Sequence, residues 1–445
     1  MPHLKRLGPG LFLVLLAGCF PVELDVNDKG DVLIARQEGF FIYNPQTRKA
    51  SVIAGPGGGQ PVFARFAPGG KEALLVVKMS RDDFRFDLAP LAGGGAPKTI
   101  YKGQNTAYTL FSPDGTYLAI TRVTDKERKG VPNSKIPELI LLEPAKDKRE
   151  VLLEDVLVAF RWFRDSDRLL LFKIQSVSKD DKVTGELIEL DVKSRKQKPL
   201  AAAITNQRLC LELSPDNKAI LFTAIVAGKP GEKLVLPEDP FPSVKLYEWK
   251  AGEQGSRVFN DKAQFARYSP SGKHVLLAEH PVLQSAQITV ADATGKETAT
   301  VATDGVLNHG GDLTLPGWLD DNTIYYFADR SVYGSGGNSF SLMTVAADGT
   351  KKKNAQPALD KAVLQLAKDM PTSVDDAKGG GDANAEPKDA KGGEPREGRG
   401  VAHPRAGEGL PFWVWPAVIV AVLGVAVLLV VGVGGVLLLR RGKKA

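Results

Sequence analysis

Residues 111–120 read FSPDGTYLAI, and weaker copies of this ten-residue phrase recur along most of the chain. Seven copies occur before residue 330, and they start at Val26, Phe66, Phe111, Trp162, Leu213, Tyr268 and Trp318. The starts are 40 to 55 residues apart. A repeat of this length is the signature of stacked supersecondary units.

The composition of the phrase predicts a β-hairpin. A large apolar residue such as Phe111 ends one strand, and Pro-Asp-Gly at 113–115 favours a tight turn before a second apolar strand. Two further strand-like runs follow each copy, for example 39–43 (GFFIY) and 49–54 (KASVIA). Four strands per repeat are typical of a propeller blade. The sequence therefore predicts an all-β, seven-bladed β-propeller over residues 19–358, with six blades as the alternative and no strand exchanged between its ends.

The phrase also resembles the WD40-like (PD40) repeat of TolB-type propellers. That repeat centres on an aromatic residue, Ser-Pro-Asp-Gly, a lysine and an apolar strand, and the match is closest at Phe111 and Tyr268. The Gly-His and Trp-Asp pairs of true WD40 repeats are missing. The resemblance implies the fold and a habit of binding other molecules, because fold alone does not specify an activity.

The N-terminus is typical of an export signal at residues 1–18. Lys5 and Arg6 precede a short apolar run, which is too short to span a membrane as a helix. Residues 16–19 read Leu-Ala-Gly-Cys and resemble the lipobox of bacterial lipoproteins, which implies lipidation of Cys19 after cleavage. An ordinary signal peptide with a coincidental cysteine, or an uncleaved anchor, is the alternative.

The C-terminus predicts a membrane anchor. No charged residue occurs from Phe412 to Leu439, and about 20 apolar residues are enough to span a bilayer. Residues 440–445 are basic, and positive flanks stay on the cytoplasmic side. We therefore expect the propeller on the extracytoplasmic side, periplasmic or extracellular. The run also resembles export sorting tails that are cleaved, but no sortase-like or Pro-Glu-Pro motif precedes it.

Residues 359–411 have the composition of a flexible linker. Glycine, alanine, proline and interleaved charges dominate, and such a stretch cannot bury enough apolar surface to offset its ordering entropy. Ala362–Asp369 could form two helical turns at its start.

The charge distribution argues against nucleic acid as a partner. The net charge of +6 equals the six basic residues at the two ends of the chain, Lys5, Arg6, Arg440, Arg441, Lys443 and Lys444. The remaining 52 basic residues balance the 52 acidic ones. The basicity is therefore a signal of membrane topology rather than a phosphate-binding surface.

The sequence predicts no catalytic residue, cofactor or metal site. His274 and His280 share one face of a strand, but their spacing matches no common metal motif, and a structural role is favoured. Cys210 is the second of only two cysteines, so we interpret it as a small buried hydrophobe. No hydrolase-type Gly-x-Ser-x-Gly motif occurs.

Two classes of function remain. The favoured one is a membrane-anchored, non-catalytic binding or scaffold module for a protein partner in the cell envelope. The alternative is an enzyme with a cryptic active site over the central channel, with Asp114 or Asp321 as candidate acids. Both aspartates already have a turn role in the phrase.

Three consecutive repeats carry long loops that predict a binding surface. These loops are residues 123–135, 175–185 and 226–242, and loops on a rigid scaffold are common recognition sites. Exposed apolar residues rimmed by charge suggest a protein contact. The candidate binding residues are Lys126, Arg128, Lys129, Lys179, Lys182, Leu234, Leu236 and Phe241. Long loops that merely tolerate insertion are the alternative.

Overall fold

The computed structural model describes residues 24–92, 95–128, 135–178, 182–206, 209–235, 237, 239, 242–279, 285–305, 315–329 and 340–369. Within these ranges the chain is built almost wholly of antiparallel β-strands, together with one helix, α2 (Gln356–Asp369). The all-β class predicted from the phrase is therefore confirmed.

Each copy of the phrase lies in the first hairpin of four strands that follow one another in chain order, and we number these units repeat 1 to repeat 7. Repeat 1 comprises β1 (Asp25–Val26), β2 (Val32–Arg36), β3 (Gly39–Asn44) and β4 (Lys49–Ala54). Repeat 2 comprises β5 (Gln60–Phe66), β6 (Glu72–Lys78), β7 (Asp83–Pro90) and β8 (Lys98–Gln104). Repeat 3 comprises β9 (Thr106–Phe111), β10 (Leu118–Glu127), β11 (Lys135–Glu143) and β12 (Lys148–Glu154).

Repeats 4 and 5 comprise β13 (Val156–Trp162), β14 (Arg168–Val177), β15 (Val183–Asp191) and β16 (Gln197–Thr205); and β17 (Leu211–Leu213), β18 (Ala219–Ala224), β20 (Lys245–Lys250) and β21 (Ser256–Asn260). Repeats 6 and 7 comprise β22 (Phe265–Tyr268), β23 (His274–Glu279), β24 (Ala286–Asp292) and β25 (Glu297–Gly305); and β26 (Gly317–Asp320), β27 (Thr323–Asp329), β28 (Phe340–Ala346) and β29 (Lys353–Asn354).

Two pairings depart from this simple order. Gly305 of β25 pairs with Ala328 of β27, so repeats 6 and 7 share one eight-stranded sheet. The short strand β19 (Val226–Gly228) belongs to repeat 5 in the chain but pairs with β16 of repeat 4. The described strands therefore form six hydrogen-bonded sheets.

The hairpin of the phrase is held by its own side chains. Ser112 Oγ accepts a hydrogen bond from the Tyr117 amide at 2.9 Å and donates one to Asp114 Oδ1 at 2.6 Å. Gly115 has a φ of 77°, which an L-residue adopts only at a cost. The same serine and aspartate bonds recur at Ser214 and Asp216. The turn chemistry read from the sequence therefore accounts for the local structure.

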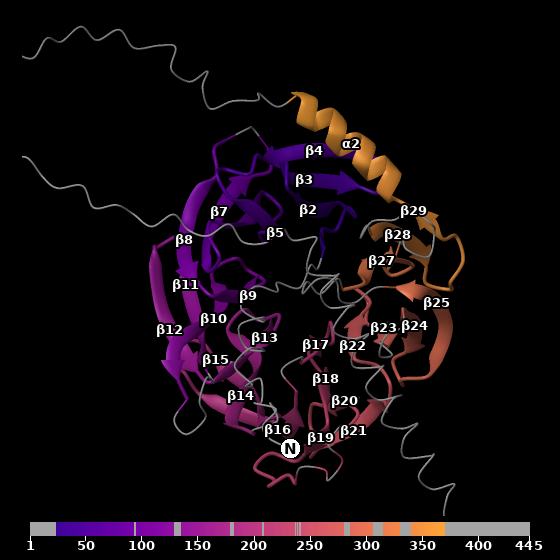
Figure 1. The fold of residues 1–445 in the computed structure, drawn as a ribbon. Helices are drawn as coiled ribbons and strands as arrows, with labels where there is room; N and C mark the ends of the chain where they lie inside the picture. Colours follow the sequence, from indigo (N-terminus) through magenta and orange to yellow (C-terminus); the bar gives the residue numbers. More distant parts are fainter. Residues whose placement is uncertain are drawn as a thin grey trace, which may run out of the picture. The chain divides into compact units, whose positions relative to one another are not determined.

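The repeats follow one another around a ring, with the first strands such as β9, β13 and β17 toward the centre and the fourth strands at the periphery (Figure 1). The core lies between neighbouring repeats. Phe172 of repeat 4 packs in one cluster with Phe222 and Tyr247 of repeat 5. Two tryptophans that open the phrase tie repeats directly: Trp162 Nε1 donates to the Leu110 carbonyl at 3.1 Å, and Trp318 Nε1 donates to the Arg267 carbonyl at 3.2 Å.

Repeats 1 and 7 meet at a seam without exchanging a strand in the described residues, because β1 pairs with β2. Tyr325 Oη of repeat 7 donates to the Leu24 carbonyl at 2.9 Å. Residues of both repeats and of α2 form one buried cluster there, which includes Val32, Tyr43, Leu319, Tyr325, Leu342 and Leu359. The sequence predicted four strands in each repeat, and therefore that repeat 1 would need no strand from the other end of the propeller.

Some boundaries differ from the sequence predictions. The expected loop at 123–135 is shortened, because β10 continues to Glu127 and β11 starts at Lys135. The loop at 175–185 is likewise shortened by β14 and β15, and residues 226–228 of the third loop form β19. α2 occupies 356–369, so the helix begins before the expected linker and takes its first eleven residues. Cross-strand pairing and tertiary packing extend these elements beyond their local signals.

The predicted signal peptide, Cys19, the linker beyond residue 369, the span at 412–439 and the basic tail lie outside the described residues. In the part of the chain that the structure describes, no helix has both the length and the apolar character needed to cross a bilayer.

Candidate functional site

Seven polar residues lie near the centre of the ring and interact with neighbouring repeats, and we call them the inner belt. Its members lie mostly on the first strands of the repeats: Asp25, Arg65, Tyr108, Arg161, Glu212, Arg267 and Tyr325. All but the two tyrosines occupy the position immediately before a copy of the phrase. Tyr108 lies two residues before that position on β9, and Tyr325 pairs with Gly317, which fills it in repeat 7. The belt therefore follows the period of the sequence.

Arg161 is the best-connected member of the inner belt. Its Nη1 donates to Tyr108 Oη of repeat 3, and its Nε donates to Glu212 Oε2 of repeat 5 at 3.1 Å. The exposed fractions of the Arg161 and Glu212 side chains are 19% and 13%. Burial acts to lower the pKa of Arg161, but Tyr108 and Glu212 raise it above its ordinary value. Arg161 is therefore charged in the folded protein, whereas burial raises the pKa of Glu212 against the effect of Arg161.

The other members of the belt join repeat 1 to repeat 2, repeat 2 to repeat 3, and repeat 6 to repeat 7. The Arg65 guanidinium lies over the Tyr108 ring, 5.3 Å from its centroid, and Asp25 accepts a hydrogen bond from the Phe66 amide of repeat 2. Burial lowers the pKa of Arg267, against the effect of its hydrogen bond with Tyr325. Burial also raises the pKa of Asp25, against the effect of Arg65. Each member is thus held by neighbouring repeats, and the belt stabilises the ring.

The predicted loop surface is partly formed. Lys126 Nζ lies 2.6 Å from Glu154 Oε1 at the end of repeat 3, and Arg128 Nη2 lies 2.7 Å from Asp155 Oδ1, the residue that links repeats 3 and 4, so both cations are paired. Lys182 is half-buried, and its amide donates to Ser178 Oγ. Lys129, Lys179, Leu236 and Phe241 lie outside the described residues.

The third loop is tied to repeat 4. β19 pairs with β16 from Ala202 to Ile204, and the Gly231 amide donates to Glu186 Oε1 at 2.9 Å. Leu234 is half-buried beside Gly228, whereas Val235 is 79% exposed. The structure thus ties the third loop to the sheet of repeat 4 and fixes the base of an exposed apolar side chain.

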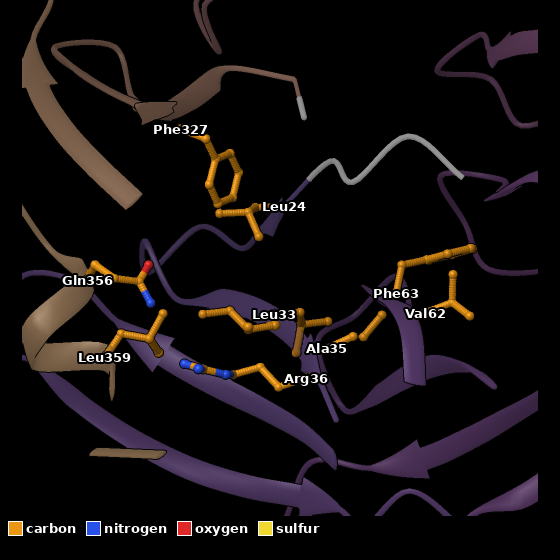
Figure 2. Close-up of a pocket in the computed structure, with 11 residues that line it drawn as sticks. Leu24, Leu33, Ala35, Arg36, Val62, Phe63, Phe327, Gln356 and Leu359 are labelled. Carbon is orange, nitrogen blue, oxygen red and sulfur yellow. The ribbon is translucent and has the colours of Figure 1, made fainter. Parts of the chain in front are cut away.

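A pocket of about 180 Å³ lies at the seam (Figure 2). Its walls come from repeats 1, 2 and 7 and from α2, and they include Leu24, Leu33, Arg36, Phe63, Phe327 and Leu359. The pocket is mainly apolar. Arg36 at its edge pairs with Asp360 of α2 at 2.8 Å and with Glu38 at 3.8 Å.

The two candidate catalytic aspartates are bound into turns. Partial burial acts to raise the pKa of Asp114, but hydrogen bonds from Ser112, Thr116 and Ser166 lower it to about 2. Asp321 accepts a hydrogen bond from the Ser271 amide at 2.9 Å, which lowers its pKa. Each aspartate links its turn to a neighbouring repeat, so both have structural roles.

Two other predicted sites have clear surroundings. The amide of Ala266 donates to Cys210 Sγ at 3.3 Å, and burial raises the pKa of this thiol to about 12, as expected for a structural cysteine. His274 stacks on Trp318 with ring centroids 6.4 Å apart, and His280 lies outside the described residues. Among the described residues, no group of histidine, cysteine, aspartate and glutamate side chains has the geometry of a metal site.

Sequence reasoning missed the inner belt. The signal was visible as charged residues at one fixed place, directly before the phrase: Asp25, Arg65, Arg161, Glu212 and Arg267. Leu110 and Gly317 fill that place in the other two repeats, which breaks the pattern. Because each contact joins different repeats, the pattern becomes meaningful only once the ring is known.

Comparisons with known proteins show similarity in structure alone. No family model matches the chain, and no curated protein matches it. Among solved structures, it is similar to the tricorn protease (12% identity, TM-score 0.51, covering 76% of this chain and 34% of that one). It is also similar to an oligogalacturonate lyase from Vibrio parahaemolyticus (11% identity, TM-score 0.51, 70% and 86% covered). TolB from Acinetobacter baumannii matches at 16% identity with a TM-score of 0.41, and 72% and 77% covered.

The chain spans about a third of the tricorn protease. At 11–12% identity, the first two likenesses show the fold and carry no information on activity. Together with the ring of four-stranded repeats, they support the β-propeller predicted from the phrase.

Proposed function

We propose that this chain is a seven-bladed propeller, anchored in a membrane and facing away from the cytoplasm, that binds a protein of the cell envelope without catalysing a reaction. The observation that carries the binding role is the apolar side chain of Val235, held on an ordered base. Val235 is the most exposed large apolar side chain among the described residues, and it lies on a loop tied to a rigid scaffold, where recognition usually resides.

The base of this tip supports recognition rather than simple tolerance of an insertion. β19 adds a strand to the sheet of repeat 4, and the Gly231 amide is fixed to Glu186. The Lys229 amide donates to Glu232 Oε2 at 2.8 Å, which closes the turn before the tip. A tip that is ordered before binding loses little conformational entropy when a partner covers it.

The membrane location rests on the two ends of the sequence. The leader at 1–18, the candidate lipidation site Cys19 and the apolar run from Phe412 to Leu439 support export and anchoring. The balanced charge of the exported part supports a protein partner over nucleic acid.

An enzymatic role has less support. Asp114 and Asp321 are committed to inter-repeat hydrogen bonds, and the lowered pKa of each makes it a poor acid at neutral pH. The solved relatives named as a protease and a lyase share the fold at low identity, which does not transfer their chemistry.

Site-specific photocrosslinking in intact cells tests the binding role. A photoreactive residue at position 235 should give a discrete crosslinked product with an envelope protein, and Val235→Asp in the same loop should reduce the yield at a crosslinker placed at residue 233. Val151, which is 49% exposed on β12, is the matched control position. Equal products from positions 235 and 151, or none from position 235, would contradict the assignment of this surface.

A further inference from the structure

The last repeat ends differently from the other six. The fourth strands of repeats 1 to 6 have five to nine residues, whereas β29 has two. Asn354 then accepts a hydrogen bond from the Gln356 amide through its Oδ1 at 2.9 Å, and α2 begins. The helix packs against β28 of repeat 7 and β4 of repeat 1, on the outside of the seam (Figure 1). α2 therefore takes the place where a longer edge strand would be expected.

Among its described side chains, α2 contacts both sides of the seam through few groups. On the side of repeat 7, Gln356 Oε1 accepts a hydrogen bond from the Leu342 amide at 3.1 Å. On the side of repeat 1, Asp360 Oδ1 lies 2.8 Å from Arg36 Nη1 and also accepts from Gln356 Nε2. Leu359 is 4% exposed and belongs to the buried cluster of the seam.

The attachment of α2 is weak compared with the sheets. The Arg36–Asp360 pair is about a third exposed, and ion pairs of this kind contribute little. A helix of 14 residues is marginal without tertiary contacts. Gln356 and Leu359 also form one wall of the 180 Å³ pocket, so the helix is incompletely packed on its inner side (Figure 2). Elements with few buried contacts open independently of the core.

We infer that α2 is a latch that holds the seam between repeats 1 and 7 and that detaches before the sheets unfold when the chain beyond Asp369 is pulled. Detachment removes Leu359 and Gln356 from the pocket and exposes the apolar seam beneath. The inference that α2 is a latch is drawn from the contacts of α2. Only the membrane anchor that would pull on the chain depends on the proposed function. The tests below use the purified full-length chain in detergent, so they do not depend on that anchor.

Hydrogen exchange of matched leucine variants tests the latch. Leu359→Ala should speed exchange at least tenfold in α2 and in the facing parts of β4 and β28, while β9 to β18 on the other side of the ring keep their protection. Leu364→Ala is the control, because Leu364 lies on the same helix and is 60% exposed. Unchanged exchange in Leu359→Ala, equal effects of the two variants, or a uniform loss over all repeats would overturn the inference.

A charge swap separates loss of the latch from general damage. Arg36→Asp and Asp360→Arg should each speed hydrogen exchange in α2. The double variant should recover at least part of the protection, because it restores the ion pair with the two charges exchanged. An additive loss in the double variant would show that the pair does not fasten the helix.

Pulling on single molecules tests the order of release. Unwinding the 14 residues of α2 from a helix to an extended chain lengthens the molecule by roughly 25–30 Å. We expect a reversible step of this size at low force before the sheets unfold, and we expect Leu359→Ala to lower its force. Release of α2 only together with the sheets would contradict the inference.

Discussion

Arg161 is the residue on which the inner belt depends most, because its guanidinium contacts the repeats on both sides. Arg161→Met leaves the buried carboxylate of Glu212 without its cation, so we expect the free energy of unfolding to fall by about 3–5 kcal/mol. Urea unfolding followed by tryptophan fluorescence measures the change.

Two further variants check the cause. Arg161→Met combined with Glu212→Leu removes both charges, and we expect it to be more stable than Arg161→Met alone. Lys126→Ala breaks an ion pair whose side chains are 63% and 48% exposed, so its cost should stay below about 1 kcal/mol. A cost for Arg161→Met no larger than for Lys126→Ala would show that the belt contributes little.

Asp114 makes the stability of the protein depend on pH at the acid end. Its folded pKa of about 2 lies below its ordinary value of 3.8, so its contribution is complete above pH 3.8 and is lost as the pH falls through 2. Because the side chain is exposed, we discount the effect and expect Asp114→Asn to cost about 1 kcal/mol at pH 7. Denaturation from pH 7 to pH 2 should show the two proteins converging, and a constant gap would refute the assignment.

At the scale of elements, the third loop divides into a structural base and a removable tip. Replacing residues 233–242 by a four-residue glycine–serine turn should change the free energy of unfolding by less than about 1 kcal/mol, because closure entropy varies slowly with loop length. Replacing 226–242 should cost more, because β19 and its three paired positions on β16 are lost. Thermal unfolding of the two variants compares them, and equal melting temperatures would contradict a structural role for β19.

Local signals predicted the hairpins well, and long-range partners explain the rest. The phrase places its turn at residues 113–115 because Ser112, Asp114 and Gly115 supply hydrogen bonds and a positive φ from within the phrase. By contrast, β19 pairs with another repeat, and the first turns of α2 are stabilised by Arg36 and Tyr43, more than 300 residues earlier in the chain. Neither partner is visible from the composition of the segment itself.

At the scale of the whole molecule, the proposed membrane location can be tested at the two ends of the sequence. We expect Cys19→Ser to abolish labelling by a palmitate analogue and a stop after residue 411 to remove the spanning run. Either change alone should leave the protein in the membrane pellet after detergent-free extraction, and both together should release it. Label that survives Cys19→Ser would exclude lipidation at that residue.

The composition of the predicted linker sets an expected limit on the separation of the two proposed anchors. A flexible coil of about 40 residues, the length between α2 and the predicted span, would have a root-mean-square reach of roughly 30–40 Å. We therefore expect both anchors to engage the same membrane.

Because each repeat is built from consecutive strands, the ring has no obligatory beginning. The link between repeats 2 and 3 is a single residue, Asn105, and the link between repeats 3 and 4 is also one residue, Asp155. A gene in which the order of repeats is rotated would keep every hairpin intact and would only move the place where the circle is cut. Duplication or deletion of a whole repeat would likewise leave the sequence of every remaining hairpin intact. We therefore expect relatives of such a protein to differ in their number of repeats, in steps of about fifty codons.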